Sequence, residues 1–428
     1  MIIIYANELT ERLRYACYIL FEVVSQTSYI MTCDLSEFLQ SPYYKINYSS
    51  QSLPSSLTII PEDVLFDKKI VKQKIIVSDI EHIKVLFANG NSGIGFDIFA
   101  ATFYMATRYE EYFFDAHFHN ENQHIAVQHH FHDLPIIHVW FDILMDYIKK
   151  DAESFPIVQP SYSFRLTYDI DHHFAYLNKS FIKNSYHVLR EFFVNFRQFT
   201  SRINVLLQKE QDPWINFDFQ NECNKQLKNM PFYFFHAGIH HNAFDNNLSP
   251  NHISYKRSIN TVKTNAHIGL HPSYQSNFAE SLQYEKCILE ELSQRDILHS
   301  RQHFLFIRFP DTYKRLIEAG IMHDHTMGYA KCIGYRAGMG RPFYWFDLKC
   351  NEITKLLLHP FVVMDVTLKN YLMLSPLSAI AKLNEVHHTA IKYKCELEII
   401  WHNSSLGECL SWNGWRSVYL HSLKLDNA

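Results

Sequence analysis

The sequence lacks the features that mark several large classes of protein. It contains no run of 18 apolar residues, so we expect no membrane span. Its formal net charge is −4, which leaves no basic surplus for binding nucleic acid or a membrane surface. Its eight cysteines include no C-x-x-C pair, which excludes a zinc ribbon or a thioredoxin motif. Cysteines scattered in this way predict reduced side chains in a cytoplasmic protein.

Glycine is also scarce, at 12 residues. Where glycines cluster, as in residues 328–340, we therefore expect the backbone to need them. The amino terminus, residues 1–6, is apolar, but it has no basic segment and is too short for the apolar core of a signal peptide. These residues predict a first β-strand.

What the chain does contain is the balance of a globular protein, with 47% hydrophobic and 20% charged residues. Its 428 residues are more than one core usually organises, which predicts two domains. The best linker is the proline-containing segment 151–160. We therefore predict a smaller α/β domain of unknown role at residues 1–155 and a second domain at residues 160–428.

Histidine is unusually frequent, at 26 residues. Six of these histidines lie close together, at His117, His119, His124, His129, His130 and His132. Such a tract could bind a metal. A solvated polar loop is the favoured interpretation, because Glu121 is the only acid among these histidines that could orient the imidazoles.

A helix is predicted to begin after Asp97, which is a suitable N-cap, and to carry an apolar face as far as Tyr109. Arg108 and Glu111 follow at a spacing of three residues. That spacing favours an ion pair on the protein surface, and a binding role for the pair is the alternative.

The second domain repeats one pattern, in which a strand ends in a polar residue and a helix follows. This pattern predicts a parallel α/β architecture. Seven successive strand ends carry side chains capable of catalysis or metal binding, namely Asp169 with Asp171, His236, His267 with His271, Arg301 with His303, Asp324, Asp365 and His402. In a barrel the carboxyl ends of the strands meet on one face, so we expect these side chains to converge there.

Aspartate and histidine together are suitable ligands for a divalent metal such as zinc, with a position left open for water. A metal acidifies water and polarises a carbonyl group, while a nearby carboxylate can act as a general base and a histidine as a general acid. The strand ends therefore predict metal-assisted hydrolysis of an amide or an ester.

The segment Thr167-Tyr168-Asp169-Ile170-Asp171 is similar to the T-F-D-D-G motif of the polysaccharide deacetylase (NodB-homology, carbohydrate esterase) superfamily, with one residue inserted. The resemblance covers about residues 160–420. It implies a distorted (β/α)7 barrel and a metal-dependent hydrolase that removes an N- or O-linked acetyl group from a carbohydrate. It also makes Asp169 the base and Asp171 a metal ligand.

The second motif of that superfamily, I-G-x-H-[ST]-x-x-H, resembles residues 268–275 and makes His271 a metal ligand. Gln275 occupies the position of the second metal-binding histidine. We expect His303 to replace it, because His303 is an extra histidine where the superfamily has proline. The alternatives are that His303 only hydrogen-bonds to a ligand, or that metal binding is lost.

Two further motifs assign catalytic roles by the same resemblance. The segment Arg301-Gln302-His303-Phe304 resembles R-P-P-[YF], which makes Arg301 the residue that orients the base. The strand that ends in Trp401-His402-Asn403 makes His402 the general acid. Asp324 occupies the place of a supporting acid.

Substrate contacts are expected from Arg336, Tyr168 and Trp401, although Arg336 could instead bridge loops. With its additional first domain, the chain resembles intracellular deacetylase-like proteins found beside bacterial surface-polysaccharide loci. Two other functions stay open. The Asp169-x-Asp171 pattern also occurs in metal-dependent glycosyltransferases, and the substitution at Gln275 would suit a sugar-binding barrel that has lost its metal.

Overall fold

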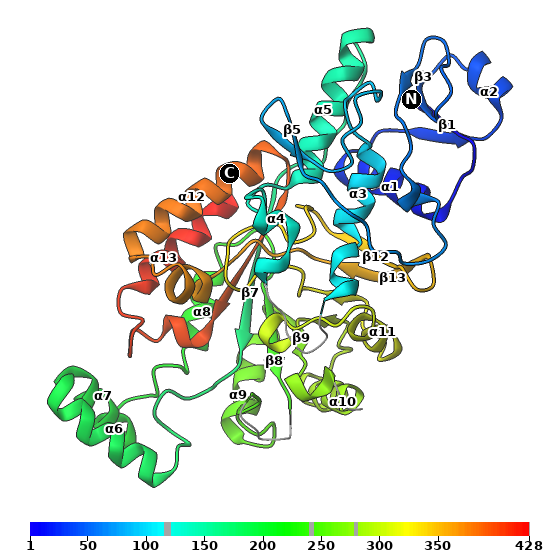
Figure 1. Cartoon of the computed structure of the whole chain (residues 1–428). Helices are drawn as coiled ribbons and strands as arrows, with labels where there is room; N and C mark the ends of the chain where they lie inside the picture. Colours follow the sequence, from blue (N-terminus) through cyan, green and yellow to red (C-terminus); the bar gives the residue numbers. More distant parts are fainter. Residues whose placement is uncertain (115–120, 239–243, 278–280, 428) are drawn as a thin grey trace.

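The computed structural model describes residues 1–114, 121–238, 244–277 and 281–427 (Figure 1). A parallel four-stranded sheet lies near the amino terminus, in the order β2-β1-β3-β4. Its strands are β1 (Ile2–Ala6), β2 (Tyr29–Thr32), β3 (Tyr44–Tyr48) and β4 (Leu57–Thr58). Residues 2–6 thus form the first strand, as predicted, and all five are buried.

Helices pack around this small sheet, and a two-stranded hairpin follows it, formed by β5 (Ser78–Ile80) and β6 (Ile83–Val85). The α-helices are α1 (Glu11–Tyr18), α2 (Leu35–Gln40), α3 (Ile98–Ala106), α4 (Ile125–Gln128) and α5 (Ile136–Asp151). The π-helix η1 (Ile19–Val24) and the 3-10 helices η2 (Asp63–Leu65), η3 (Tyr109–Phe113) and η4 (Glu121–Gln123) complete this part. The predicted N-cap of α3 is confirmed, since Asp97 accepts hydrogen bonds from the backbone N–H groups of Phe99 and Ala100.

A larger sheet of nine strands has the order β12-β13-β11-β10-β9-β8-β7-β15-β14. Its strands are β7 (Ser163–Ile170), β8 (Phe232–His236), β9 (His267–His271), β10 (His299–Ser300), β11 (His323–Asp324), β12 (Phe343–Asp347), β13 (Glu352–Leu358), β14 (Val363–Met364) and β15 (Glu396–His402). All neighbouring strands are parallel except the antiparallel pair β12–β13. The predicted parallel α/β architecture is therefore present.

The described residues do not form the predicted closed barrel as one continuous sheet. Among the described residues, β12 and β14 are the two ends of the sheet and no ladder joins them. Residues 359–362 nevertheless connect β13, which pairs with β11, to β14, which pairs with β15. The chain itself therefore spans from one side of the sheet to the other, and closure into a (β/α)7 barrel stays a prediction.

Helices follow most of these strands, as expected for an α/β protein. They are α6 (Phe181–Val194), α7 (Phe196–Leu206), α8 (Phe217–Asn224), α9 (Ile253–Val262), α10 (Leu282–Ser293), α11 (Asp311–Glu318), α12 (Pro376–Lys392) and α13 (Trp415–Leu423). Short helical turns are η5 (Tyr274–Asn277), η6 (His303–Leu305), η7 (Thr367–Tyr371), η8 (Asn403–Leu406) and η9 (Lys424–Asn427). Among the helices described, none is both long and apolar enough to cross a membrane.

The amino-terminal part and the large sheet share one continuous apolar core. The side chain of Tyr15 donates a hydrogen bond to the carbonyl group of Tyr344, and Arg12 donates one to Asn351. Farther along, Glu111 forms a buried ion pair with Arg336. The predicted division near residue 155 stays a prediction, because extensive burial joins the two sides.

The predicted surface pair of Arg108 and Glu111 does form, but in the interior. Arg108 Nε lies 2.6 Å from Glu111 Oε1, and the two side chains are 1% and 3% exposed. Arg108 also contacts Glu110 and His124. The expectation of a surface location was wrong, because residues 109–113 turn inward as a 3-10 helix instead of continuing α3.

Candidate metal centre

Residues from the ends of three strands of the large sheet and from one loop meet at its carboxyl edge. Asp171 directly follows β7, while His271 ends β9 and His402 ends β15. His303 starts η6, after β10. The parallel register sets Asp169 opposite His402. Because parallel neighbours end at the same edge, side chains distant in the sequence become adjacent.

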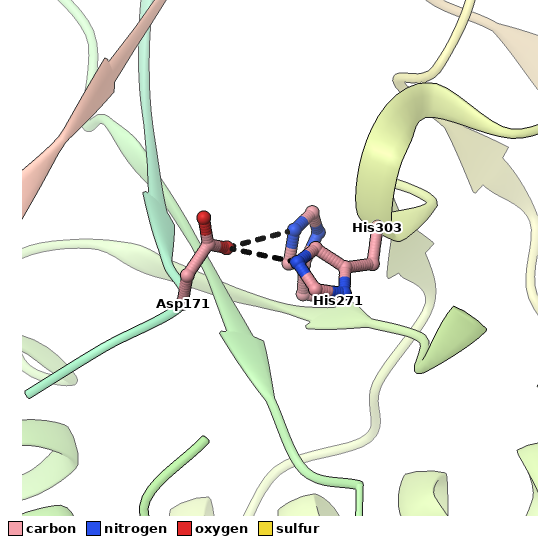
Figure 2. Close-up of side chains that lie close together, drawn as sticks. All are labelled: Asp171, His271 and His303. Atoms are coloured by element: carbon pink, nitrogen blue, oxygen red, sulfur yellow. Dashed lines mark ion pairs between the residues drawn. The ribbon is translucent and has the colours of Figure 1, made fainter. Parts of the chain in front are cut away.

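Asp171, His271 and His303 form a group whose ligand atoms all lie within 4.8 Å of one another (Figure 2). Asp171 Oδ1 is 3.1 Å from His271 Nε2 and 4.0 Å from His303 Nε2. These are the three residues expected to bind the metal. Gln275, by contrast, contributes only its backbone N–H, which donates to Asp245.

The two imidazoles are held so that the same nitrogen faces the centre. His271 Nδ1 lies 2.6 Å from the carbonyl oxygen of Arg301, and His303 Nδ1 lies 3.2 Å from Asp245 Oδ1. A carbonyl and a carboxylate can only accept hydrogen bonds, so each Nδ1 carries the hydrogen. In the neutral rings, the Nε2 lone pairs then point at Asp171 Oδ1. A cation among these three electron-rich atoms, or a proton on one of the imidazoles, relieves their mutual repulsion.

Two further observations fit a cation at this point. Asp171 Oδ1 is buried and has no hydrogen-bond partner among the residues described. Burial lowers the pKa of His271, but the charges of Asp169 and Asp171 outweigh burial and raise it. The site therefore attracts positive charge, and the donor set of two imidazoles and one carboxylate fits a divalent metal with open positions.

Asp245, which the sequence did not single out, orients one side of this centre. Its carboxylate accepts hydrogen bonds from His303 Nδ1 at 3.2 Å, from His236 Nε2 at 3.1 Å and from the backbone N–H of Tyr274 at 2.8 Å. Burial opposes its ionisation, but the hydrogen bonds from His236 and His303 hold the pKa of Asp245 well below its usual range. A loop aspartate outside any motif offers no signal for this role in one sequence.

Arg301 holds Asp169 on the other side of the centre. The guanidinium donates from Nη1 to Asp169 Oδ1 and to Thr167 Oγ1, both at 2.8 Å. It also pairs with the buried carboxylate of Glu398. Arg301 and Asp169 are 0% and 2% exposed. The guanidinium therefore orients the Asp169 carboxylate, as its predicted role requires.

His402 lies opposite the two metal-facing histidines. Its Nε2 is 3.7 Å from Asp171 Oδ2, and its Nδ1 is 2.7 Å from Asp365 Oδ1. Asp365 also accepts the backbone N–H of His402 and the hydroxyl of Ser405. Burial lowers the pKa of His402, but the Asp365 carboxylate outweighs burial and raises it to about 10. The imidazole therefore carries a proton at neutral pH.

Asp324 lies away from this centre. It is fully buried on β11, where its carboxylate accepts hydrogen bonds from Ser300 and from both the backbone and the hydroxyl of Thr326. Burial raises its pKa to about 6. No hydrogen bond or ion pair between Asp324 and Asp169 or Asp171 is found in the described structure. The charge of Arg301, which holds Asp169, acts on the Asp324 carboxylate and lowers its pKa, and the supporting catalytic role of Asp324 stays a prediction.

The three residues expected to bind substrate are buried with partners of their own. Arg336 pairs with Glu111, which agrees with the bridging alternative. The hydroxyl of Tyr168 bonds to Asn224 and Tyr419, and the indole of Trp401 donates to Ser422. Tyr168 and Trp401 alternate with Asp169 and His402 along their strands, so they face the covering helices instead of the centre. Their substrate-binding roles receive no support from these contacts.

A second layer of titratable side chains lies beneath the centre. His325 Nδ1 is 2.9 Å from Glu398 Oε2, and the rings of His325 and His359 stack with centroids 4.3 Å apart. These three residues form another group that could hold a metal ion. Glu398 is already paired with Arg301 and lies 3.5 Å from Arg165. Because two guanidinium groups repel a further cation, this group is the weaker candidate.

The histidine tract takes no part in these groups, nor in a third potential metal group formed by His236, Asp245 and His303. His117 and His119 lie outside the described residues, and no other histidine of the tract belongs to a potential metal group among the residues described. His124 is fully buried, with Nδ1 3.0 Å from Arg108 Nη2. The expected solvated loop is therefore wrong for His124, because this residue packs against the buried Arg108.

Comparisons with known proteins add little about activity. Residues 2–153 match the model of a family of unknown function, DUF7033. The comparison with curated proteins finds no match. Among solved structures, the chain is similar to a protein of Mycobacterium smegmatis provisionally described as a polysaccharide deacetylase, at 12% identity and a TM-score of 0.37 over 62% of this chain and 82% of that one.

A 4-alpha-glucanotransferase from Thermococcus litoralis has the same TM-score of 0.37 at 11% identity, over 63% of this chain and 38% of that one. Neither likeness is strong enough to carry over a site or a reaction. The site's own geometry must therefore support any function.

Proposed function

We propose that the protein is a metal-dependent hydrolase that removes an N- or O-linked acetyl group from a carbohydrate. The observation that carries this proposal is the group formed by Asp171, His271 and His303, with a buried carboxylate oxygen that lacks a hydrogen-bond partner within the described structure. Zinc is the metal we expect, because this donor set with open positions is typical of catalytic zinc.

Each neighbouring side chain has a place in such a reaction. A bound metal would supply Lewis acidity that polarises the acetyl carbonyl and acidifies water. Asp169, held by Arg301, removes a proton from the attacking water. The water oxygen bonds to the carbonyl carbon, the bond from that carbon to the sugar nitrogen or oxygen breaks, and His402 protonates the leaving atom. Acetate and a free amine or hydroxyl are the products.

In this proposal His303 replaces the missing second histidine. Its Nε2 faces Asp171, whereas Gln275 contributes a backbone contact to Asp245. The chain thus keeps an Asp-His-His donor set with one histidine moved to the next strand end. This arrangement supports an enzyme over a sugar-binding barrel without metal.

The glycosyltransferase alternative draws less support from the geometry. It needs Asp169 and Asp171 to act together on a metal and a diphosphate. Asp169 is instead bound to Arg301, and Asp171 faces two histidines. The protonated His402 beside Asp365 would also be left without a role.

Metal content tests the proposal most directly. The purified protein is expected to contain about one zinc per chain, and Asp171→Ala and His303→Ala should each lose most of it. Gln275→Ala is the matched control and should retain the metal. The wild-type protein should release acetate from an acetylated saccharide. Unchanged zinc in His303→Ala would refute the ligand assignment, and absence of metal from the wild-type protein would refute the hydrolase.

A further inference from the structure

Helices α6 and α7 form a hairpin that projects from the body of the molecule, at the lower left of Figure 1. The sequence predicts one helical region over about residues 180–210. The structure instead ends α6 at Val194 and starts α7 at Phe196, with Asn195 as N-cap accepting from the backbone N–H of Gln198. This break lets α7 turn back beside α6.

The hairpin exposes an unusual amount of apolar surface. Phe181, Ile182 and Phe193 are 86%, 80% and 76% exposed. The other large apolar side chains exposed on this hairpin are Tyr186, Leu189, Phe192, Val194, Phe196 and Leu207. Scattered apolar residues are normal on a protein surface, but a contiguous patch of this kind marks an interaction site.

The apolar side chains are exposed although α6 and α7 pack against each other. Arg202 donates from Nε and Nη2 to the two carboxylate oxygens of Glu191, each at 2.7 Å, and both residues are buried between the helices. The rings of Phe192 and Phe199 also contact each other, with centroids 5.2 Å apart. The Arg202–Glu191 ion pair and the ring contact therefore hold the two helices together. The exposed apolar side chains lie on the outside of this folded hairpin.

The hairpin is predominantly basic. Residues 177–210 contain six basic residues, which are Lys179, Lys183, Arg190, Arg197, Arg202 and Lys209, and two acids, Glu191 and Glu210. Glu191 is neutralised by Arg202. Lys179, Arg190 and Arg197 are exposed beside the apolar side chains. The partner surface must therefore be apolar and anionic at the same time.

A second copy of the chain does not meet this requirement. In a two-fold dimer the same patch would face itself. Arg190 and Arg197 would then meet like charges, and Glu210, at the end of the hairpin, is the one exposed acid among residues 177–210 that could balance them. An anionic bilayer presents phosphate groups above an acyl region, which suits an apolar surface bordered by basic residues.

The hairpin follows β7 and Asp171 along the chain, and its root is fixed to the body of the molecule. Its root is held by Asp212, whose carboxylate accepts the backbone N–H groups of Ala175, Tyr176 and Leu177. A hollow of about 720 Å³ adjoins this root, with His172, Lys179, His187 and Trp214 among its lining residues. His172 directly follows Asp171. The hollow lies at the root of the hairpin, and Asp171, His271, His303 and His402 are not among its lining residues.

We propose that the α6–α7 hairpin docks the protein on an anionic lipid bilayer. Its exposed apolar side chains enter the boundary between headgroups and acyl chains, and Arg190 and Arg197 lie at the level of the phosphates. Docking brings the centre to the membrane surface. It does not depend on the proposed hydrolysis.

Sedimentation of the full-length protein with vesicles tests the proposal. The protein should bind phosphatidylcholine vesicles that contain phosphatidylglycerol, and it should bind pure phosphatidylcholine much less. Phe181→Ser/Ile182→Ser/Phe193→Ser and Arg190→Glu/Arg197→Glu should each reduce partitioning at least about tenfold.

Met373→Ser/Leu377→Ser is the matched control, because these side chains are 83% and 78% exposed outside the hairpin. It should bind vesicles like the wild type, as should Asp171→Ala, so a failure of the hydrolase proposal is distinguishable from a failure of docking. Equal binding by the triple serine variant, or no binding by the wild type, would overturn docking. A dimer in light scattering that the triple variant abolishes would assign the surface to a second copy instead.

Discussion

At the scale of single residues, the candidate centre is set by the partners of its ligands as much as by the ligands. His303 faces Asp171 because Asp245 accepts the hydrogen of its Nδ1. His271 faces Asp171 because the carbonyl oxygen of Arg301 accepts the hydrogen of its Nδ1. Such partners fix the tautomer and the direction of the coordinating lone pair, and their loss weakens metal binding.

Replacing Asp245 by Asn should therefore weaken zinc binding by about 10- to 100-fold, while the three ligands stay in place. The measurement is a competition titration with a zinc chelator. Asp212→Asn is the matched control, since Asp212 also accepts several backbone N–H groups but belongs to none of the potential metal groups of the described residues. Equal zinc affinity in Asp245→Asn and the wild type would contradict the assigned role.

At the scale of elements, the buried His138 connects α5 to the second half of the chain through two hydrogen bonds. His138 Nδ1 donates to the carbonyl of Tyr393 at 3.1 Å, and its Nε2 accepts the backbone N–H of Gly340 at 3.1 Å. The contact at Nε2 needs the neutral ring, because a protonated Nε2 could not accept the Gly340 N–H. Burial and the nearby charge of Arg341 lower the pKa of His138 to about 3.

This residue makes stability sensitive to acid. Its folded pKa lies below its unfolded value of about 6.5, so the unfolded chain takes up the proton first as the pH falls. Its contribution to stability is complete above pH about 6.5 and decreases as the pH falls toward about 3, by about 2 kcal/mol between pH 7 and pH 5. In His138→Gln, which keeps a donor and an acceptor but does not titrate, urea unfolding at the two pH values should show a correspondingly smaller difference. An unchanged difference would refute this origin.

At the scale of the whole molecule, the amino-terminal part and the large sheet are joined by buried charges. Arg336 lies on the loop after β11 and pairs with Glu111, which also pairs with Arg108. All three side chains are nearly inaccessible. Removing one partner from such a group leaves buried charge incompletely compensated.

Arg336→Met should consequently lower the free energy of unfolding by about 3 kcal/mol, measured by urea denaturation. The same variant separates this role from the predicted role in substrate binding. If Arg336 only joins the two parts, the KM of the folded variant should stay close to that of the wild type. A raised KM with unchanged stability would restore the substrate-binding role. Arg341→Met, which removes an arginine that donates only to backbone carbonyls, is the control.

The net charge of the whole chain does not reveal the local excess of basic residues in the α6–α7 hairpin. The net charge of −4 offers no reason to expect a membrane surface. The excess of basic over acidic residues in segment 177–209 is compensated by acids elsewhere in the chain. Only the exposure of the hairpin, on a projecting scaffold, turns that local excess into a candidate docking surface.

The sequence by itself determined the alternation of strands and helices and the polar residues at the strand ends. These follow from local patterning, because apolar strands must be buried and a carboxylate on a strand needs a polar partner or a place at the strand's end. The strand-end pattern also predicted that His303 and Asp171 converge on one face, whereas their assignment as metal ligands came from a resemblance. Tertiary structure alone decided that Asp245 orients His303, that Arg336 is buried against Glu111, and that Tyr168 and Trp401 face the helices. Such contacts join residues far apart in the chain, and no local pattern encodes which distant partner a side chain will meet.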